Sequence, residues 1–308
     1  MGIIKRPWTL AEPWVLCNFA LRWRLWLCPL WATAVAAPIL IYTTMNKITI
    51  LGTGHATVTR CYNTCFVLHT DTTMLLVDAG GGNGILTQLR RAGIAIDTLH
   101  HLYVTHAHTD HILGTVWVIR MVLSAPQYEG QLHIYSHDKG LLVMRTLCQL
   151  TLSARQQARM DSRVVFHRLT DGQEFGVGDI AMQCFDIHSS KELQYGFRAT
   201  LPDGTVVVCL GDEPYNPLCQ GYVDQPDWLM SEAFCLYADR DHYHPYEKCH
   251  STALDAGRVA QQLQARHLIL YHTEDDHLDT RSQRYAAEAA QAYRGPVYVP
   301  DDLDVIEL

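Results

Sequence analysis

Thr105-His106-Ala107-His108-Thr109-Asp110-His111 is the most informative stretch of this sequence. It follows Leu102-Tyr103-Val104, which is typical of a buried strand, and it precedes residues 112–123, which have helical periodicity. Four side chains that can bind metal therefore lie within six residues on a strand-to-helix turn. Imidazole and carboxylate ligands suit zinc, with manganese or iron as alternatives, and the absence of cysteine favours a hydrolytic over a structural site.

Outward from this stretch, short β-branched segments alternate with segments of helical periodicity. The expected strands are 48–51, 65–69, 74–78, 102–105, 132–135, 164–168, 180–187, 195–200, 206–210, 228–230, 267–271 and 297–299. The expected helices are 86–92, 112–123, 253–266 and 281–293. This alternation indicates an α/β or α+β domain, built either on one doubly wound parallel sheet or on two sheets flanked by helices.

The His-x-His-x-Asp-His stretch resembles the defining motif of the metallo-β-lactamase superfamily. Asp78, His188, Asp212 and His272 follow in the order of that superfamily, each near the end of an expected strand. The resemblance implies an αββα four-layer sandwich over residues 45–308, in which Asp78 supports the metal ligands without binding metal. It implies seven metal ligands. One cation is held by His106, His108 and His188, and a second by Asp110, His111 and His272. Asp212 is shared by both cations.

Within the superfamily, four further segments resemble ribonuclease Z and related phosphodiesterases. Leu51-Gly52-Thr53-Gly54 resembles their opening glycine loop, and Gly196-Phe197-Arg198 lies where they have Gly-Tyr-Arg. Ser231-Glu232-Ala233-Phe234 resembles their His-Glu-Ala-Thr motif, with serine and phenylalanine in place of histidine and threonine. His250-Ser251-Thr252-Ala253 resembles their His-Ser-Thr motif.

The resemblance also implies a mechanism. Two divalent cations, expected to be Zn²⁺, share a hydroxide that attacks a phosphodiester. His250, oriented by Glu232, faces the scissile phosphate and assists the leaving group near neutral pH, and Asp110 is expected to act in catalysis as well as in metal binding. The alternative for His250 is a position at a helix N-terminus without catalytic duty.

Two other functions stay open from the sequence. A lactonase or another carboxylic ester or amide hydrolase can use the same fold and metals, although such relatives generally lack a His-Ser-Thr-Ala segment. A non-catalytic metal-binding protein is the second alternative, although no expected ligand has been lost.

Charge and spacing restrict the substrate. The formal net charge is −8; residues 1–44 hold four basic residues and one acidic residue, so the remainder carries −8 − 3 = −11. Proteins that grip long nucleic acids normally have a basic face. In bacterial ribonuclease Z, a flexible arm that grips tRNA lies between the third histidine and the shared aspartate, whereas here only one expected hairpin separates His188 from Asp212. We therefore expect a small phosphodiester or an RNA end as substrate and no strong nucleic-acid-binding surface, and leave a homodimer open.

Residues 1–44 form a hydrophobic extension that has three interpretations. The uncharged segment 25–46 after Arg24, together with Ala34-Val35-Ala36, favours a signal peptide or a membrane anchor. Two prolines within it, and an expected strand directly after Met45, favour an over-extended start, with the working protein beginning at Met45. We expect a cytoplasmic protein. If residues 1–44 are translated as part of it, export or membrane anchoring is the alternative.

The remaining histidines and the cysteines carry weaker expectations. His55, on the glycine loop, is expected near the mouth of the site. His242 and His244 either belong to a surface loop or line the substrate pocket together with Lys248. The ten cysteines are scattered without a paired motif, and we expect them to be reduced and mostly buried.

Overall fold

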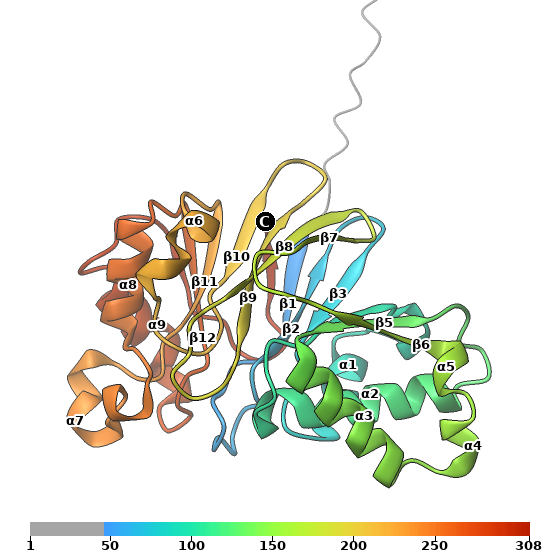
Figure 1. The fold of residues 1–308 in the computed structure, drawn as a ribbon. Helices are drawn as coiled ribbons and strands as arrows, with labels where there is room; N and C mark the ends of the chain where they lie inside the picture. The colour runs from blue at the N-terminus through green and yellow to red at the C-terminus, as the bar shows by residue number, and fades with distance from the viewer. Residues whose placement is uncertain (1–45) are drawn as a thin grey trace, which may run out of the picture. The chain divides into compact units, whose positions relative to one another are not determined.

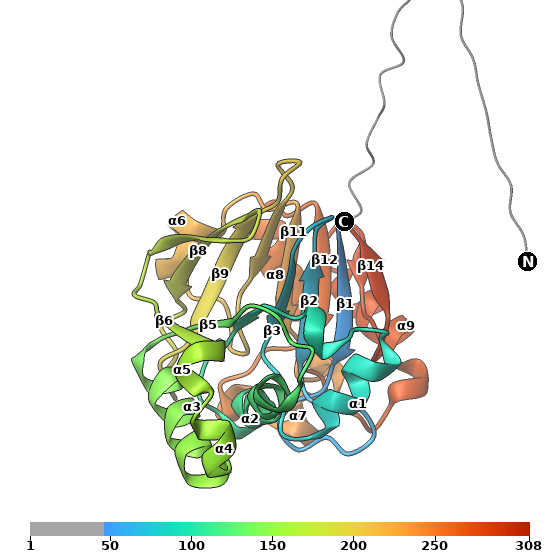
Figure 2. The same cartoon turned by 90° about the vertical axis from the view of Figure 1, so that its right-hand side faces the viewer.

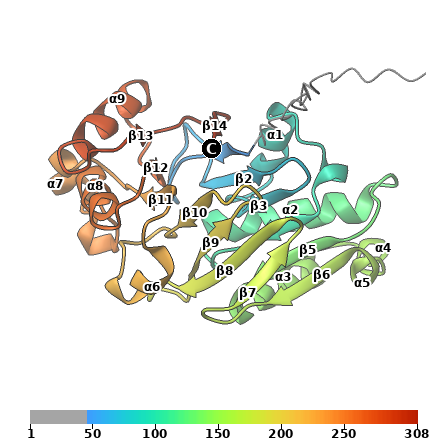
Figure 3. The same ribbon diagram turned by 90° about the horizontal axis from the view of Figure 1, so that it is seen from above.

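Strand β2 (Cys65–His69) is buried along its whole length because both of its faces are covered. In the computed structural model, which describes residues 46–308, Phe66 and Leu68 of this strand point into a core between two sheets. Cys65 and Val67 point the other way, into a second core beneath helices. A third core lies between the other sheet and its own helices. The four layers are therefore helix, sheet, sheet and helix (Figure 1 and Figure 3).

The first sheet has seven strands, and β14 lies beside β1 at its edge (Figure 2). Strands β3 to β6 run parallel to one another. The strands, in spatial order, are β14 (Val305–Glu307), β1 (Lys47–Gly52), β2, β3 (Met74–Val77), β4 (His101–Tyr103), β5 (Leu132–Ser136) and β6 (Val164–Arg168).

The second sheet also has seven strands, and within it β10 to β13 run parallel. Strands β9 and β10 form an antiparallel hairpin. The strands, in spatial order, are β13 (Val297–Tyr298), β12 (His267–Tyr271), β11 (Trp228–Glu232), β10 (Val206–Cys209), β9 (Tyr195–Thr200), β8 (Ile180–Asp186) and β7 (Glu174–Val177).

Helices cover the outer face of each sheet. The first sheet packs against α1 (Gly84–Arg91), α2 (Thr109–Ser124) and α3 (Asp138–Thr151), which are followed by α4 (Ala154–Gln157) and α5 (Met160–Arg163). The second sheet packs against α6 (Gln220–Val223), α8 (Ala253–Gln262) and α9 (Leu278–Ala289), whereas α7 (Arg240–Tyr243) lies in the loop before α8. Short 3₁₀ helices are η1 (Ile96–Thr98), η2 (Pro217–Cys219), η3 (Tyr237–Asp239) and η4 (Tyr246–Lys248).

The predicted αββα sandwich is confirmed, and so is the single hairpin between His188 and Asp212. The elements that were not predicted are strands β7 and β14, helix α3, the four-residue helices α4 to α7 and the 3₁₀ helices. The helix α3 exposes Leu142 and Leu150, so its apolar residues do not follow one face and its periodicity is blurred. All eight cysteines of residues 46–308 are free, and six of them are buried, as expected.

The predictions for residues 1–44 and for a start at Met45 lie outside the described residues. Within residues 46–308, no helix is both long enough and apolar enough to cross a membrane.

Candidate metal centre

The predicted ligands lie at the ends of strands, along one edge of both sheets. His106 follows β4 in the first sheet, whereas Asp212 follows β10 and His272 follows β12 in the second. Because β3 to β6 are parallel, and so are β10 to β12, their carboxyl ends lie at a common edge of each sheet. Residues far apart in the sequence are thereby brought together.

Helix α2 begins inside the motif and is packed tightly against the turn after β3. Asp110 lies in its first turn. Gly114 makes the close packing feasible, because a Cβ at this position would lie 1.8 Å from the carbonyl oxygen of Ala79. The Gly114 N–H donates to Gly80 O (2.8 Å), and the Ala79 N–H donates to His111 O (3.0 Å). These contacts fix the start of α2, and so the motif, relative to the first sheet.

Asp78 holds the motif from the same turn. Its Oδ1 accepts a hydrogen bond from Thr105 N (2.8 Å), and its Oδ2 accepts one from Thr105 Oγ1 (2.7 Å). The same Oδ2 lies 2.8 Å from Nδ1 of His111. Asp78 has a φ of 54°, a left-handed conformation that costs energy in a residue with a side chain and often occurs at functional sites. Its contact with Nδ1 leaves Nε2 of His111 facing the site.

The side chains converge on one carboxylate oxygen. Oδ2 of Asp212 lies 3.5 Å from Nε2 of His111 and 3.6 Å from Nε2 of His272. The same oxygen lies 3.6 Å from Nε2 of His106. Oδ2 of Asp110 lies 3.4 Å from Nε2 of His111 and 3.6 Å from Nε2 of His272.

His108 completes the cluster. Its Nδ1 lies 2.9 Å from Nε2 of His106. Among the described residues, two groups of potential ligands therefore meet at Asp212: His106, His108 and Asp212 form one, and Asp110, His111 and His272 form the other.

These separations fit shared cations better than direct hydrogen bonds. N···O distances of 3.4–3.6 Å exceed the usual hydrogen-bond range of about 2.7–3.2 Å. Nε2 of His111 and both ring nitrogens of His272 are buried without a hydrogen-bond partner among the described residues. Two ligands of a tetrahedral zinc, each about 2.0–2.1 Å from the metal, lie about 3.3 Å apart. The side chains present therefore fit divalent cations.

Burial and neighbouring charges set the protonation states. Burial lowers the pKa of His106 and of His272, so both rings are neutral, as cation binding requires. Burial opposes ionisation of Asp212, but the surrounding histidines, His106 first, hold the pKa of Asp212 well below its usual value. Burial also disfavours a charge on His111, but the carboxylates of Asp78 and Asp110 raise the pKa of His111 well above its ordinary value. A cation at Nε2 of His111 must therefore displace a proton.

His188 lies apart from the cluster. It is exposed, has a φ of 58°, and donates its backbone N–H to Oδ1 of Asp186 (2.8 Å). No group of potential ligands in residues 46–308 includes it. The structure thus brings six of the seven predicted ligands together, and the role of His188 stays a prediction.

His250 and Glu232 border the same site. Nδ1 of His250 lies 3.7 Å from Oε2 of Glu232, and its ring stacks on Phe234 at 4.7 Å and 9°. Glu232 also accepts hydrogen bonds from the N–H groups of Ser251 (2.5 Å) and Phe234 (3.1 Å), so it connects two loops as well as approaching the histidine. The N-cap of α8 is Thr252, so His250 does not cap this helix.

Three residues at the site were not predicted from the sequence: Lys191, Gln194 and Glu213. Gln194 is buried, and its amide contacts Nδ1 of His106 (2.7 Å) and Oδ1 of Asp212. Lys191 and Gln194 lie in the loop between β8 and β9, which carries no recognisable motif after His188. Of these three residues, only Glu213 could have been found from the sequence, because it directly follows the predicted ligand Asp212.

A pocket of about 470 Å³ opens beside the cluster. His55 lines it, as predicted, and so do Lys248, Lys191 and His250. His242 and His244 are not among the lining residues, so of the two predictions for these histidines the surface loop is the one that the structure supports.

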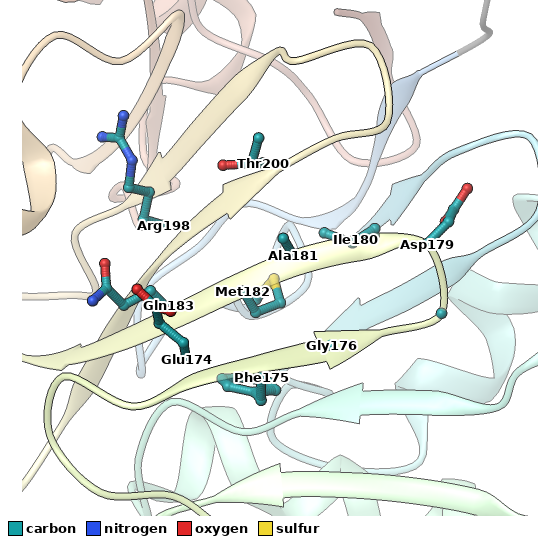
Figure 4. A pocket seen from close by; sticks show the side chains of 11 residues that line it. Glu174, Phe175, Gly176, Asp179, Ile180, Ala181, Met182, Gln183, Arg198 and Thr200 are labelled. Atoms are coloured by element: carbon teal, nitrogen blue, oxygen red, sulfur yellow. The ribbon is translucent and has the colours of Figure 1, made fainter.

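A larger hollow of about 740 Å³ lies on the outer face of β7, β8 and β9 (Figure 4). Arg198 and Thr200 of β9, Gln183 of β8 and Glu174 of β7 line it. No histidine or cysteine is among the lining residues, so it lacks the chemistry of the metal cluster.

Solved structures share this fold. The metallo-β-lactamase fold protein YhfI from Bacillus subtilis has a TM-score of 0.69 and 21% identity, covering 86% of this chain and 100% of that one. The short form of human tRNase Z has a TM-score of 0.67 and 21% identity, covering 85% and 98%. Ribonuclease Z of Myxococcus xanthus is 26% identical over an alignment of 313 residues, which covers 85% of this chain and 97% of that protein. The protein is a metal-dependent hydrolase with the metallo-β-lactamase fold, as the motifs predicted.

Within this class, residues 46–293 match the family described as Anti-Pycsar protein Apyc1. The chain belongs to this family. The matched region contains all six clustered ligand candidates, together with Glu232 and His250.

Proposed function

We propose that the protein is a dinuclear-metal phosphodiesterase. One cation would be held by His106, His108 and His188, a second by Asp110, His111 and His272, and Asp212 would contact both, with Zn²⁺ as the expected metal. The observation that carries this proposal is the position of Asp212 Oδ2, which lies 3.5–3.6 Å from three histidine nitrogens belonging to both groups. A single carboxylate oxygen in such a place is suited to neighbouring two cations.

Bound cations would supply a nucleophile near neutral pH and neutralise charge on the phosphoryl oxygens. Neighbouring side chains hold the proposed metal ligands in place. Asp78 fixes the ring of His111 through Nδ1, and Gln194 contacts both His106 and Asp212. Hydrogen bonds of this kind around the ligands typically matter for metal affinity.

His250 is suited to act on the leaving group. Phe234 holds the ring by stacking, and Nδ1 is turned toward Glu232. Nε2 faces the pocket, where it lies 3.5 Å from Nζ of Lys191. A histidine held in this way can exchange a proton with a leaving oxygen, an effect worth about 10²–10⁴ in rate. Glu232 acts on the substrate through His250 and is a positioning residue.

A small or flexible phosphodiester, such as a cyclic nucleotide or an RNA end, fits the site best. The pocket of about 470 Å³ is in the range of small-molecule sites. Only the β9–β10 hairpin lies between His188 and Asp212, so no arm at this position grips tRNA. A relative named ribonuclease Z acts on RNA, which is consistent with phosphodiester chemistry.

The test compares two substrate classes on protein of known metal content. Bis(p-nitrophenyl) phosphate should be hydrolysed, and a panel of lactones should not. Preferential lactone hydrolysis would show that the same metals serve carboxylic chemistry, and inactivity on both classes with metals bound would favour a non-catalytic role. The cytoplasmic location and the oligomeric state stay predictions.

A further inference from the structure

Lysine is rare in this chain and concentrated at the pocket. The sequence contains only five lysines among its 24 basic residues. Four of them lie in residues 46–308, and two of these four, Lys191 and Lys248, line the pocket beside the metal cluster. Elsewhere the chain uses arginine for most of its positive charges. An ammonium group is a compact point charge with three donors that can turn toward a ligand, whereas a guanidinium is a rigid plane.

Lys191 is held at the pocket by a buried carboxylate. Oε1 of Glu213 lies 3.5 Å from Nζ of Lys191 and accepts a hydrogen bond from Ser189 Oγ (2.6 Å). Oε2 of Glu213 accepts one from Ser190 N (3.3 Å). Glu213 is only 7% exposed and directly follows Asp212. The loop that carries Lys191 is therefore fixed to the same chain segment as the central carboxylate of the cluster.

The ammonium group of Lys191 retains capacity for a further ligand. Its other neighbours are Lys248 O at 3.3 Å and Nε2 of His250 at 3.5 Å. All three of its polar contacts are longer than the usual hydrogen-bond range of about 2.7–3.2 Å. The side chain is 28% exposed, so a ligand in the pocket can reach it.

Lys248 adds a second charge at the same mouth. Its Nζ lies 5.1 Å from the centre of the Phe234 ring, a cation–π contact on the ring that stacks with His250. Among residues 46–308, no carboxylate forms an ion pair with this ammonium group. The body of the protein is acidic, so two lysines together here concentrate positive charge at one place.

We propose that Lys191 and Lys248 form a two-lysine clamp for anions, which binds the negatively charged phosphate part of the substrate and of the phosphomonoester product. The clamp deepens the proposed function and rests on it for the identity of the substrate. Lys191 donates to a phosphoryl oxygen beside His250, and Lys248 attracts negative charge from the adjacent segment before α8. The clamp favours anionic over neutral substrates.

Phosphate binding tests the clamp without relying on turnover. Inorganic phosphate should raise the unfolding temperature of the metal-loaded wild-type protein. Lys191→Met and Lys248→Met should each weaken the apparent affinity for phosphate about tenfold, with metal content unchanged. Each removes a positive charge from the pocket, and Lys191→Met also removes a charge-assisted hydrogen bond. Lys191→Arg should recover most of the affinity because it keeps the charge.

Lys139→Met is the matched control. Lys139, in α3, forms an ion pair with Glu192, which lies next to Lys191, but Lys139 does not line the pocket. Its loss should therefore leave the phosphate affinity within about twofold of the wild-type value. If Lys191→Met does not fold, Lys191→Gln replaces it. Equal phosphate affinity in the wild type and in both lysine variants would overturn the clamp, as would a wild type that phosphate does not stabilise.

Steady-state kinetics separates the clamp from the proposed function. On bis(p-nitrophenyl) phosphate, the lysine variants should raise KM about tenfold, with a smaller change in kcat, and inhibition by phosphate should weaken in parallel. If the protein cleaves no phosphodiester but the lysine variants still lose phosphate binding, the proposed function fails and the clamp stands. A kcat loss with unchanged KM and phosphate affinity would contradict the clamp alone.

Discussion

His111 lies in the first turn of α2, which covers the first sheet, whereas Asp212 follows β10 of the second sheet; Nε2 of His111 nevertheless lies only 3.5 Å from Oδ2 of Asp212. Asp212 is 4% exposed, so its charge has no solvent to stabilise it. Asp212→Ala should therefore lower the occupancy of both cations, whereas Asp78→Asn should weaken binding less, because Asp78 orients His111 and Thr105 but is not itself a proposed ligand. Elemental analysis after reconstitution measures this. At most one tightly held metal in the wild type, or full occupancy in Asp212→Ala, would contradict the dinuclear proposal.

Whether His188 is the third histidine ligand of the first cation can be tested directly. It is exposed and outside the cluster, but its proposed role places it on a cation. Chemical modification with diethylpyrocarbonate, read by peptide mass spectrometry, should label His188 readily in the metal-free protein and at least tenfold more slowly with zinc bound. The exposed His242 should react equally in both states. Equal labelling of His188 with and without metal would show that it is not a ligand.

His250→Ala should lower kcat on a phosphodiester by about 10² or more and leave metal content unchanged. Glu232→Gln should cause a smaller loss, because the amide oxygen can still accept one of the two backbone hydrogen bonds that Glu232 receives. His242→Ala serves as the control. A His250→Ala enzyme with the wild-type kcat would contradict the proposed role of this histidine.

Phe234 separates two histidines, with ring centroids 4.5 Å from His55 and 4.7 Å from His250. Phe234→Thr, the residue of the His-Glu-Ala-Thr motif, should leave a cavity and destabilise the protein by about 3 kcal/mol. It should also lower kcat several-fold, because the His250 ring loses its support. Phe234→Tyr should retain most of the stability and activity. Urea unfolding and kinetics together check this, and a fully active, stable threonine variant would disprove it.

Stability should fall in acid because of two neutral histidines outside the site, the buried His69 and the half-buried His101. Burial lowers the pKa of His69 and of His101 to about 4. An unfolded chain takes up protons on these rings near pH 6.5, so between about pH 6.5 and 4 the unfolded state binds more protons and stability is lost as pH falls. The loss should be of order 1 kcal/mol for His69 by pH 5, and smaller for His101, because solvent reaches that ring and screens it.

Urea unfolding of metal-free protein at pH 7 and pH 5 measures this loss. His69→Gln keeps a partner for Thr49 Oγ1 and should reduce the pH dependence. His242→Gln, at an exposed position, should not. The same pH dependence in wild type and His69→Gln would rule out a contribution from His69.

Salt dependence distinguishes small substrates from long nucleic acids. An acidic body without a tRNA-gripping arm should cleave precursor tRNA poorly, and activity on a small phosphodiester should fall only weakly between 50 and about 200 mM salt. Efficient precursor-tRNA cleavage that falls steeply with salt would contradict the substrate proposal.

Local patterns predicted most strands and the metal-binding motif but left two architectures open. The resemblance to the metallo-β-lactamase superfamily then implied the αββα sandwich and most of the cluster. The His106–His111 motif and the residues at strand ends can be recognised from apolar segments that stop at a ligand-type residue. The contributions of Lys191, Gln194 and Glu213 depend on how a loop folds back over the site, and no local pattern specifies this. Helix α3 was missed for a related reason, since Leu142 and Leu150 remain exposed and hide its periodicity.

Gly114 shows how a residue without a side chain can belong to a metal site. Any side chain there would collide with the Ala79 carbonyl and push the start of α2, with Asp110 and His111, away from the turn after β3. Position 114 should therefore tolerate substitution as poorly as the ligands themselves. In a saturation-mutagenesis screen for metal-dependent activity, Gly114→Ala should lose as much activity as variants that lack a metal ligand. Gly82→Ala should keep the wild-type activity, because a Cβ at position 82 would meet no atom within 4 Å.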